Sequence, residues 1–443
     1  MNKIILYLAI AIIVISILSL IFSPQNSTPS ETASHYPCQF PTQAPHPDAT
    51  QTDFNQFSWR LFIALNWPVK SQLRGQPDCR FSLDDKQQSV WQSYKNINDI
   101  FIEQGQIPSP WNQTQNETPL SQLTKVTNQA SNLAELQKIG GWVIDQQGNP
   151  TYYEILVNQI SFDYIVKNKL YDYNTLIDKD NINFPDSSTQ IKASWRILNP
   201  PQDEISRYIT KQANIRLFDQ QGQAKNQTTN AILGLVGLHI ITKASGYPQW
   251  IWSTFEHRNN VPIQMMENNS LVNQPQTGIN YHYYDANARA SDVNQSPCLW
   301  MERPTINGMK SNNDTKKSPL ICQPKSNISF QTPTPLERYT PINEMTKEVN
   351  QYQQENTPVQ YTVLENYQLI ATQYPTQPDH PSDPLGQPNP KLAANITMES
   401  YVQASSSCIG CHSQASAPNS QYPSDYSYLF LSVNIPTPKP TAQ

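Results

Sequence analysis

The chain begins with a long apolar run, and this run constrains where the rest of the protein can fold. After a short polar start that includes Lys3, residues 4–22 are apolar apart from one tyrosine and two serines. As a helix this run would span roughly 28 Å, close to the ~30 Å hydrocarbon core of a bilayer. It ends in Phe22-Ser23-Pro24, without the small-residue pattern at which secretory signals are cleaved. We therefore expect an uncleaved signal anchor in residues 1–23, with the bulk of the chain outside the cytoplasm.

The remaining chain divides by composition and periodicity into three parts. Residues 24–53 are rich in serine, threonine, proline and glutamine, which is typical of a flexible linker. In residues 54–390, apolar residues recur first at helical spacing and then alternate as in strands, without sustained βαβ order. We predict an α+β fold, with a mostly antiparallel, β-rich soluble domain and flanking helices, one of them at residues 90–104. Residues 391–443 form a C-terminal segment that we expect to pack on that domain.

Charge excludes one class of partner. Charged residues make up 15% of the chain, against about 25% in a typical soluble protein. The formal net charge is −5, and the sequence contains no basic stripe. We therefore expect no nucleic-acid partner.

The six cysteines separate into two groups. Two belong to a C-x-x-C-H motif near the C-terminus, and the other four are Cys38, Cys79, Cys298 and Cys322. An even number outside the motif, in an exported chain, predicts two disulfide bonds. Three pairings are compatible with the sequence, and we predict the nearest-neighbour one, Cys38 with Cys79 and Cys298 with Cys322. The alternative is a set of buried thiols, which a reducing compartment would favour.

The C-x-x-C-H motif carries the chemistry of the chain. Cys408 and Cys411 have the spacing that places two thiols at the two vinyl groups of one porphyrin, and His412 follows directly as an iron ligand. The motif therefore predicts one covalently attached haem c, with His412 as its proximal ligand. A redox dithiol would need a βαβ context, and a zinc site would need a second ligand pair at short spacing. We find neither in the sequence.

Several segments of the chain resemble a family of bacterial exported proteins described as cytochrome c family. They are WRLFIALNWP at 59–68, WSTFEHRNNVP at 252–262, and MESY at 398–401 leading into SCIGCH at 407–412. These segments are spread over most of the predicted soluble part. The resemblance implies haem attachment and redox chemistry, and it implies no particular substrate.

The distal ligand of the iron is less determined by sequence. No methionine or histidine follows His412, so such a ligand must come from upstream. Met398 is the nearest candidate, and His257 and His282 are alternatives because each lies in a polar, aromatic cluster. We interpret His239, in an apolar strand, as a core histidine. Three others lie in proline-rich loops and are poor candidates: His35, His46 and His380.

The leading hypothesis is a monohaem c-type cytochrome that transfers electrons in the periplasm. It would be anchored in the inner membrane by its N-terminal helix and would exchange electrons with a periplasmic or membrane redox partner. The alternative is a haem-dependent oxidase or peroxidase-like enzyme with an open iron site, in which His257 or His282 acts as acid and base. A third hypothesis is a binding module with a structural haem. The sequence leaves the first two open, and a visible spectrum would separate them.

Overall fold

The computed structural model describes residues 37–434, with gaps at 47, 86, 114–118, 122–140, 223, 269, 303–319, 326–327, 379–386 and 418. The side chains of 298, 300–302 and 320–324 also lie outside the description. The predicted anchor in residues 1–23 falls outside the described residues. Within them, no helix is long and apolar enough to cross a membrane.

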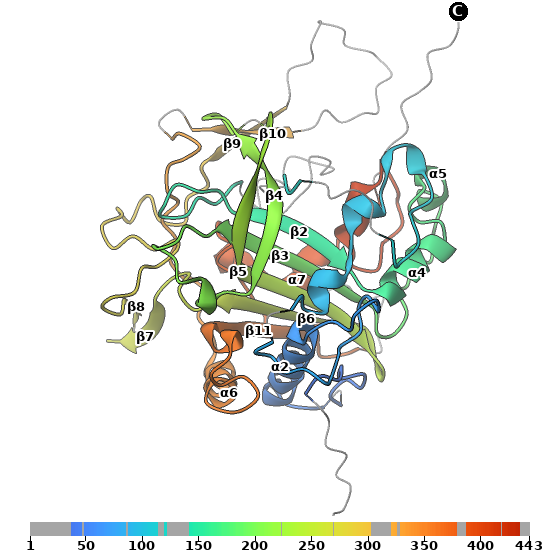
Figure 1. The fold of residues 1–443 in the computed structure, drawn as a ribbon, viewed down its shortest axis with the longest axis horizontal. Helices are drawn as coiled ribbons and strands as arrows, with labels where there is room; N and C mark the ends of the chain where they lie inside the picture. The colour runs from blue at the N-terminus through green and yellow to red at the C-terminus, as the bar shows by residue number, and fades with distance from the viewer. Residues whose placement is uncertain are drawn as a thin grey trace, which may run out of the picture. The chain divides into compact units, whose positions relative to one another are not determined.

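An antiparallel sheet lies at the centre of the described unit (Figure 1). The prediction of a mostly antiparallel β-rich domain with a few helices is confirmed, since each ladder of this sheet is antiparallel. β4 (Thr210–Phe218) pairs with β5 outside the main order. The main order is β1 (Lys95–Asn96), β2 (Tyr152–Val157), β3 (Thr189–Ile197), β5 (Ala224–Ala244), β6 (Tyr247–His257), β11 (Tyr367–Pro375) and β12 (Pro388–Asn389).

The remaining elements surround this sheet. Two separate hairpins are formed by β7 (Ile263–Glu267) with β8 (Ser270–Gln274) and by β9 (Cys298–Glu302) with β10 (Leu320–Pro324). The helices are α2 (Gln51–Asn66), α4 (Gln159–Lys167), α5 (Tyr173–Leu176), α6 (Glu344–Gln354) and α7 (Cys408–His412). Short 3₁₀ turns connect them: η1 (Trp91–Ser93), η2 (Ile97–Asp99), η3 (Glu103–Gly105), η4 (Ile205–Arg207), η5 (Val363–Asn366), η6 (Gln403–Ser405) and η7 (Tyr428–Ser432).

Helix α2 follows from local sequence signals. Thr50 caps its first turn and forms a capping box with Asp53, which satisfies backbone donors that have no partner inside the helix. The helix ends before Pro68, because the residue that precedes a proline favours an extended conformation. Its buried face packs on β11 and α6, and Ser58 Oγ lies 2.6 Å from Ser253 Oγ of β6.

Alternation along β6 gives the sheet two different faces. Phe255 stacks on Phe62 of α2, with ring centroids 4.1 Å apart. The neighbouring residues Thr254 and Glu256 instead contact residues 391–434, which cover the opposite face. Since successive side chains of a strand point to opposite faces, one strand serves both layers.

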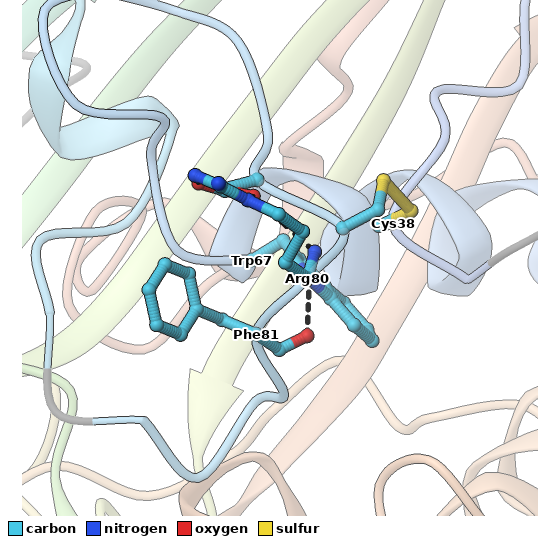
Figure 2. The surroundings of a disulfide bond; sticks show 6 residues. Cys38, Trp67, Arg80 and Phe81 are labelled. Carbon is cyan, nitrogen blue, oxygen red and sulfur yellow. Dashed lines mark hydrogen bonds and ion pairs between the residues drawn. A yellow bond between two sulfur atoms is a disulfide. The ribbon is translucent and has the colours of Figure 1, made fainter.

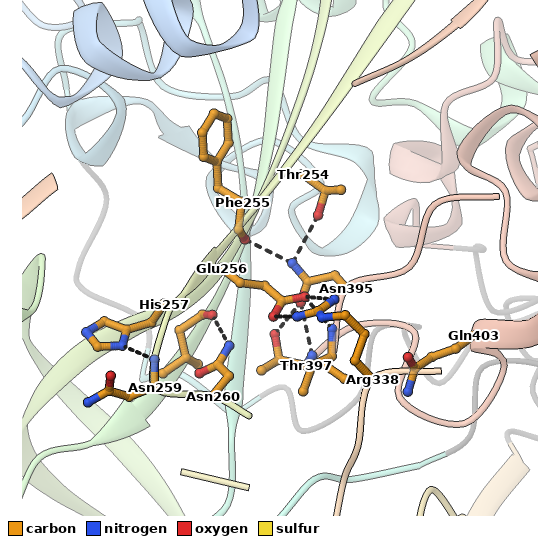
Figure 3. A network of polar contacts seen from close by, with 12 residues as sticks. Thr254, Phe255, Glu256, His257, Asn259, Asn260, Arg338, Asn395, Thr397 and Gln403 are labelled. Carbon is orange, nitrogen blue, oxygen red and sulfur yellow. Dashed lines mark hydrogen bonds and ion pairs between the residues drawn. The ribbon is translucent and has the colours of Figure 1, made fainter. Parts of the chain in front are cut away.

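Polar contacts fasten residues 391–434 to their face of the sheet (Figure 3). Asn395 Nδ2 donates to Thr254 Oγ1 at 3.0 Å and to the Phe255 carbonyl at 2.9 Å. The Ile396 amide donates to Glu256 Oε1 at 2.7 Å. Glu256 is fully buried and forms an ion pair with Arg338 at 2.6 Å. These contacts fix the register of the segment against β6.

Gly237 of β5 permits this close approach. A Cβ atom at this position would lie 2.5 Å from Ser194 Oγ and closer still to Thr397 Oγ1. Ser194 Oγ and Thr397 Oγ1 are themselves hydrogen-bonded at 2.7 Å. A side chain at residue 237 would therefore push the C-terminal segment away from the sheet.

The prediction of a helix at residues 90–104 is wrong. Its place is taken by three short 3₁₀ turns and by β1, which pairs with β2. Lys95 is fully buried, and its Nζ donates to the carbonyls of Ser109, Pro110 and Gln113. Gln104 adopts a positive φ of 63° that no α-helix accommodates. Tertiary contacts of a buried ammonium group thus outweigh the local helical pattern.

The predicted bond between Cys38 and Cys79 is confirmed (Figure 2). It joins positions 41 residues apart, and one of them, Cys38, lies in the range that we assigned to a flexible linker. The folded unit begins at Pro37 and α2 at Gln51. The disulfide and the helix cap tie residues 37–50 to the domain.

The second predicted disulfide stays a prediction. Cys298 lies on β9 and Cys322 on β10, where the backbone register sets Cys298 opposite Pro324 and Cys322 opposite Trp300. The side chains of both cysteines lie outside the described part of the structure.

Candidate functional site

The C-x-x-C-H motif forms α7, a single helical turn. Ser407 caps it, since the Ser407 hydroxyl accepts a hydrogen bond from the Gly410 amide at 3.1 Å. Ile409 points into the core and is 2% exposed. The burial of Ile409 turns the flanking residues of the motif toward the surface, where Cys408 is half-buried and Cys411 is exposed.

Gln373 of β11 holds this turn on the sheet. Its Oε1 accepts a hydrogen bond from the Ile409 amide at 2.8 Å, and its Nε2 donates to the Pro390 carbonyl at 2.7 Å. The Gln373 side chain therefore fixes both the start of α7 and the chain that leads to it. Nothing in the sequence marks Gln373 for this role, because a polar residue in a strand is ordinary.

Both motif cysteines carry thiols rather than a disulfide bond. They lie on one turn of helix, three residues apart, and the imidazole of the next residue completes the turn. This arrangement contrasts with Cys38 and Cys79, which the same chain joins as a disulfide. The motif thus offers two thiols and one imidazole side by side.

The His412 ring has a defined tautomer. Its Nδ1 lies 2.7 Å from the Tyr426 carbonyl oxygen, which can only accept. Nδ1 therefore carries the proton, and Nε2 of the neutral ring carries the lone pair that a metal ion would use. The rings of Trp252 and Tyr428 flank the imidazole, with centroids 4.5 Å and 5.0 Å away. The Tyr428 hydroxyl also donates to the Cys411 carbonyl at 2.9 Å.

A small hollow separates α7 from the sheet. Its enclosed volume is about 20 Å³, enough for a single water molecule. Among the described residues, it is bordered by side chains from β5, β6, α7 and the turn before α7. Those that bear on its chemistry are His239, Trp252, Glu399, Cys408, Cys411 and His412.

His239, which we interpreted as a core histidine, also lies at this site. It projects from β5 into the hollow, its side chain is 12% exposed, and its Nε2 lies 3.4 Å from Glu399 Oε2. Glu399 in turn accepts a hydrogen bond from the Asn395 amide at 2.9 Å. A lone histidine in an apolar strand was the available signal, but strand alternation alone does not reveal which segment faces it.

The structure places His257 away from α7. It ends β6, five residues beyond Trp252, which corresponds to about 17 Å along an extended strand. His257 Nε2 donates to the Arg207 carbonyl at 3.0 Å, and its Nδ1 accepts from the Asn259 amide at 3.1 Å. Both nitrogens are therefore engaged inside the protein.

His282 lies beside His257, with ring centroids 5.0 Å apart. The Asn260 amide group donates to the Val236 carbonyl, so Asn260 Oδ1 accepts from His282 Nδ1 at 2.9 Å. His282 Nε2 then accepts from the Tyr208 hydroxyl at 2.7 Å. Burial lowers the pKa of His257 to about 3 and the pKa of His282 well below its ordinary value. Both rings are therefore neutral structural groups at neutral pH.

Met398 occupies a third environment. It is 2% exposed, and its amide donates to the Asn395 carbonyl at 3.1 Å. Its neighbour Glu399 borders the hollow, whereas Met398 is not among the described residues that do so. The structure therefore places His257 and His282 away from the motif, Met398 is not among the described residues that border the hollow, and the assignment of these three as distal ligands stays a prediction.

Two further observations complete the description of the site. Within the described ranges, no group of three or more histidine, cysteine, aspartate or glutamate side chains is arranged to hold a metal ion. Comparison of the chain with protein-family models, curated proteins and solved structures gives no match.

Proposed function

We propose that this chain is a monohaem c-type cytochrome that transfers electrons in the periplasm. Cys408 and Cys411 would hold one haem through thioether bonds, and His412 would be its proximal iron ligand. The observation that carries the proposal is α7 itself, in which two thiols precede an imidazole whose tautomer the Tyr426 carbonyl fixes.

The chemistry of the donor set fits this group. A metal-bound histidine usually donates its other N–H to a carbonyl or carboxylate, which orients the ring and increases its basicity. The bond from His412 Nδ1 to Tyr426 is of that kind. Exposure of Cys411 leaves its thiol accessible to the reaction that forms the thioether. The hollow is far smaller than a porphyrin, so the open side beside Cys411 must provide most of the space.

When bound, the haem supplies a one-electron couple between ferric and ferrous iron. The residues of this chain would hold and orient it. Trp252 and Tyr428 pack against the imidazole and restrict its rotation. Gln373 holds the turn against β11, which fixes the position of the imidazole relative to the sheet.

The proposal includes a location. The Cys38–Cys79 disulfide fits an oxidising compartment, in which such bonds persist. The apolar run at residues 4–22 would anchor the chain in the inner membrane, with the haem-bearing segment in the periplasm. Its partners would be a one-electron donor and a one-electron acceptor in the periplasm or the membrane.

Haem attachment is tested by expressing the full chain together with a cytochrome c maturation system. We expect haem to stay with the polypeptide after denaturation in SDS, because thioether bonds survive unfolding. The Cys408→Ala/Cys411→Ala double variant should lose it. The matched control is Cys38→Ala/Cys79→Ala, which removes the other described cysteine pair and should keep covalent haem. Haem that washes out of the wild type would refute the proposal.

A further inference from the structure

We infer that the buried ion pair between Lys243 and Asp425 holds the Tyr426 carbonyl against His412, and thereby lowers the reduction potential of the iron. The inference rests on the proposed function and deepens it, because it names two positioning residues that tune the same haem through its proximal ligand. The pair acts through the backbone, since Asp425 directly precedes Tyr426, whose carbonyl oxygen lies 2.7 Å from His412 Nδ1.

The turn that presents this carbonyl has an uncommon backbone conformation. Asp425 and Tyr426 adopt positive φ values of 53° and 61° in succession. Residues with a side chain rarely adopt this left-handed conformation, and they keep it only where the surrounding structure holds them in place. The position of the carbonyl therefore depends on the contacts that hold the turn.

Asp425 makes such contacts through both its side chain and its backbone. Lys243 Nζ of β5 lies 2.8 Å from Asp425 Oδ2, and the Phe184 amide donates to the same oxygen at 2.8 Å. Lys243 Nζ also donates to Asn183 Oδ1 at 2.6 Å. The Asp425 carbonyl accepts from Trp250 Nε1 of β6 at 2.9 Å. The turn is therefore fastened to two adjacent strands of the sheet.

Lys243 supports both contacts of the Asp425 carboxylate. The Lys243 side chain is 2% exposed and that of Asp425 12%. Burial raises the pKa of the Asp425 carboxyl, and the Lys243 ammonium group opposes this rise because it favours the ionised form. Without the ammonium group the carboxyl would tend toward its neutral form, which is a weaker acceptor for the Phe184 amide. Loss of Lys243 should therefore loosen the turn.

One strand carries both the turn and the other contact of the imidazole. Trp250 and Trp252 are two residues apart on β6, so their side chains point to the same face of the sheet. Trp250 holds the Asp425 carbonyl, and the Trp252 ring lies against the His412 ring at 4.5 Å between centroids. The imidazole and the turn that orients it thus have a fixed position relative to each other.

The expected effect on the iron follows from this hydrogen bond. A carbonyl that accepts from the outer N–H of a ligating imidazole makes the ligating nitrogen more basic. A more basic ligand favours ferric iron and lowers the reduction potential. If the turn loosens, the bond from His412 weakens and the potential should rise. Covalent attachment would depend on Cys408 and Cys411 and should not change.

The first test is a redox titration of the full-length holoprotein. Lys243→Met and Asp425→Asn should each raise the reduction potential, with the covalent haem content, measured as the pyridine haemochrome, unchanged. Asp425→Asn keeps the size of the side chain, and asparagine tolerates the left-handed conformation, so this variant gives an answer if Lys243→Met folds poorly. The Lys243→Met/Asp425→Asn double variant should shift the potential no further than either single change, because both remove the same contact.

The matched control is Lys211→Met. It breaks an ion pair of the same kind, between Lys211 Nζ of β4 and Glu154 Oε2 of β2 at 2.6 Å, and neither residue is among the described ones that border the hollow beside α7. Lys211→Met should keep the wild-type potential. A wild-type potential in both Lys243→Met and Asp425→Asn would overturn the inference, as would an equal shift in Lys211→Met.

A second test needs no haem. Nitrogen NMR of His412, in the full chain produced without the maturation system, reports which ring nitrogen carries the proton. We expect the Nδ1–H tautomer in the wild type and a mixture of tautomers in Lys243→Met and Asp425→Asn. The same single tautomer in all three proteins would also overturn the inference. Absence of covalent haem from the matured wild type would instead refute the proposed function, so the two failures are distinguishable.

Discussion

The two faces of the central sheet are built from the same strands and differ in chemistry. On the face covered by α2, β6 contributes Phe255, which stacks on Phe62. On the face covered by residues 391–434, β6 contributes Thr254 and Glu256, which form hydrogen bonds with that segment. The β6 residue named on the first face is aromatic, and those named on the second are polar although all three are buried.

The difference follows from what covers each face. A long helix satisfies its own backbone hydrogen bonds, so α2 requires mainly apolar surface from the sheet. Residues 391–434 form only short turns, and their backbone groups need partners elsewhere. Glu256 and Gln373 of the sheet accept hydrogen bonds from backbone amides of this segment. An irregular segment can therefore be packed against a sheet when the strands supply polar side chains in register with it.

The largest effect is expected on the aromatic face. Phe62→Ala removes a fully buried ring and leaves a cavity against Phe255, which should lower the free energy of unfolding by about 4 kcal/mol. Unfolding in guanidinium chloride measures this loss of free energy. Phe81→Ala is the control, because Phe81 is 36% exposed and the loss of its ring should cost much less than the loss of a fully buried one. Equal effects of the two variants would contradict the assignment of this face to the core.

The second prediction concerns the buried ion pair on the polar face. Arg338→Met leaves the fully buried Glu256 carboxylate without its ion-pair partner and should cost about 3 kcal/mol. In the Arg338→Met/Glu256→Gln double variant the charge is absent, while the glutamine oxygen can still accept from the Ile396 amide. We expect the double variant to recover at least half of the loss. A double variant less stable than Arg338→Met would show that the charge is not the source of the cost.

The smallest expected effect is on the pH dependence of the free energy of unfolding. The folded-state pKa of His257, about 3, lies below its ordinary value of 6.5, so the folded state resists protonation. The stability that His257 contributes is full above about pH 6.5 and is lost as pH falls toward about 3. Between about pH 7 and pH 5 the loss should be about 2 kcal/mol, measured by urea unfolding. His257→Gln should flatten this slope, and His46→Gln, which changes an exposed histidine, should not.

Much of the architecture could be predicted from local sequence. Alternating residues predicted strands within residues 54–390, and helical spacing predicted a helix at the start of that range, where α2 lies. Parity of the cysteines with nearest-neighbour pairing predicted the Cys38–Cys79 bond that the structure contains. These features depend on periodicity or on counting, and neighbouring residues carry the signal. The failed helix at residues 90–104 shows the limit, because burial of Lys95 depends on carbonyls of later residues.

The surroundings of the motif could not be predicted in the same way. The Tyr426 contact is made by a backbone carbonyl, which every residue possesses and no sequence marks. Gln373 reaches Ile409 across 36 positions. His239 and Glu399 meet because of the register of residues 391–434 on the sheet, which many polar contacts determine together. Sequence therefore identifies the C-x-x-C-H motif but not the residues that surround it.

The irregular C-terminal segment has a consequence for the order of events during maturation. Residues 391–434 add no strand to the central sheet, so its ladders can close before this segment docks. In the proposed exported cytochrome, the chain would emerge N-terminus first, and the motif follows each strand of the described residues. If haem is attached as proposed, we expect the attachment enzymes to meet Cys408 and Cys411 on an undocked tail beside a finished sheet. Docking through Gln373 and Tyr426 would then be the last step, after which the modified turn is held in place.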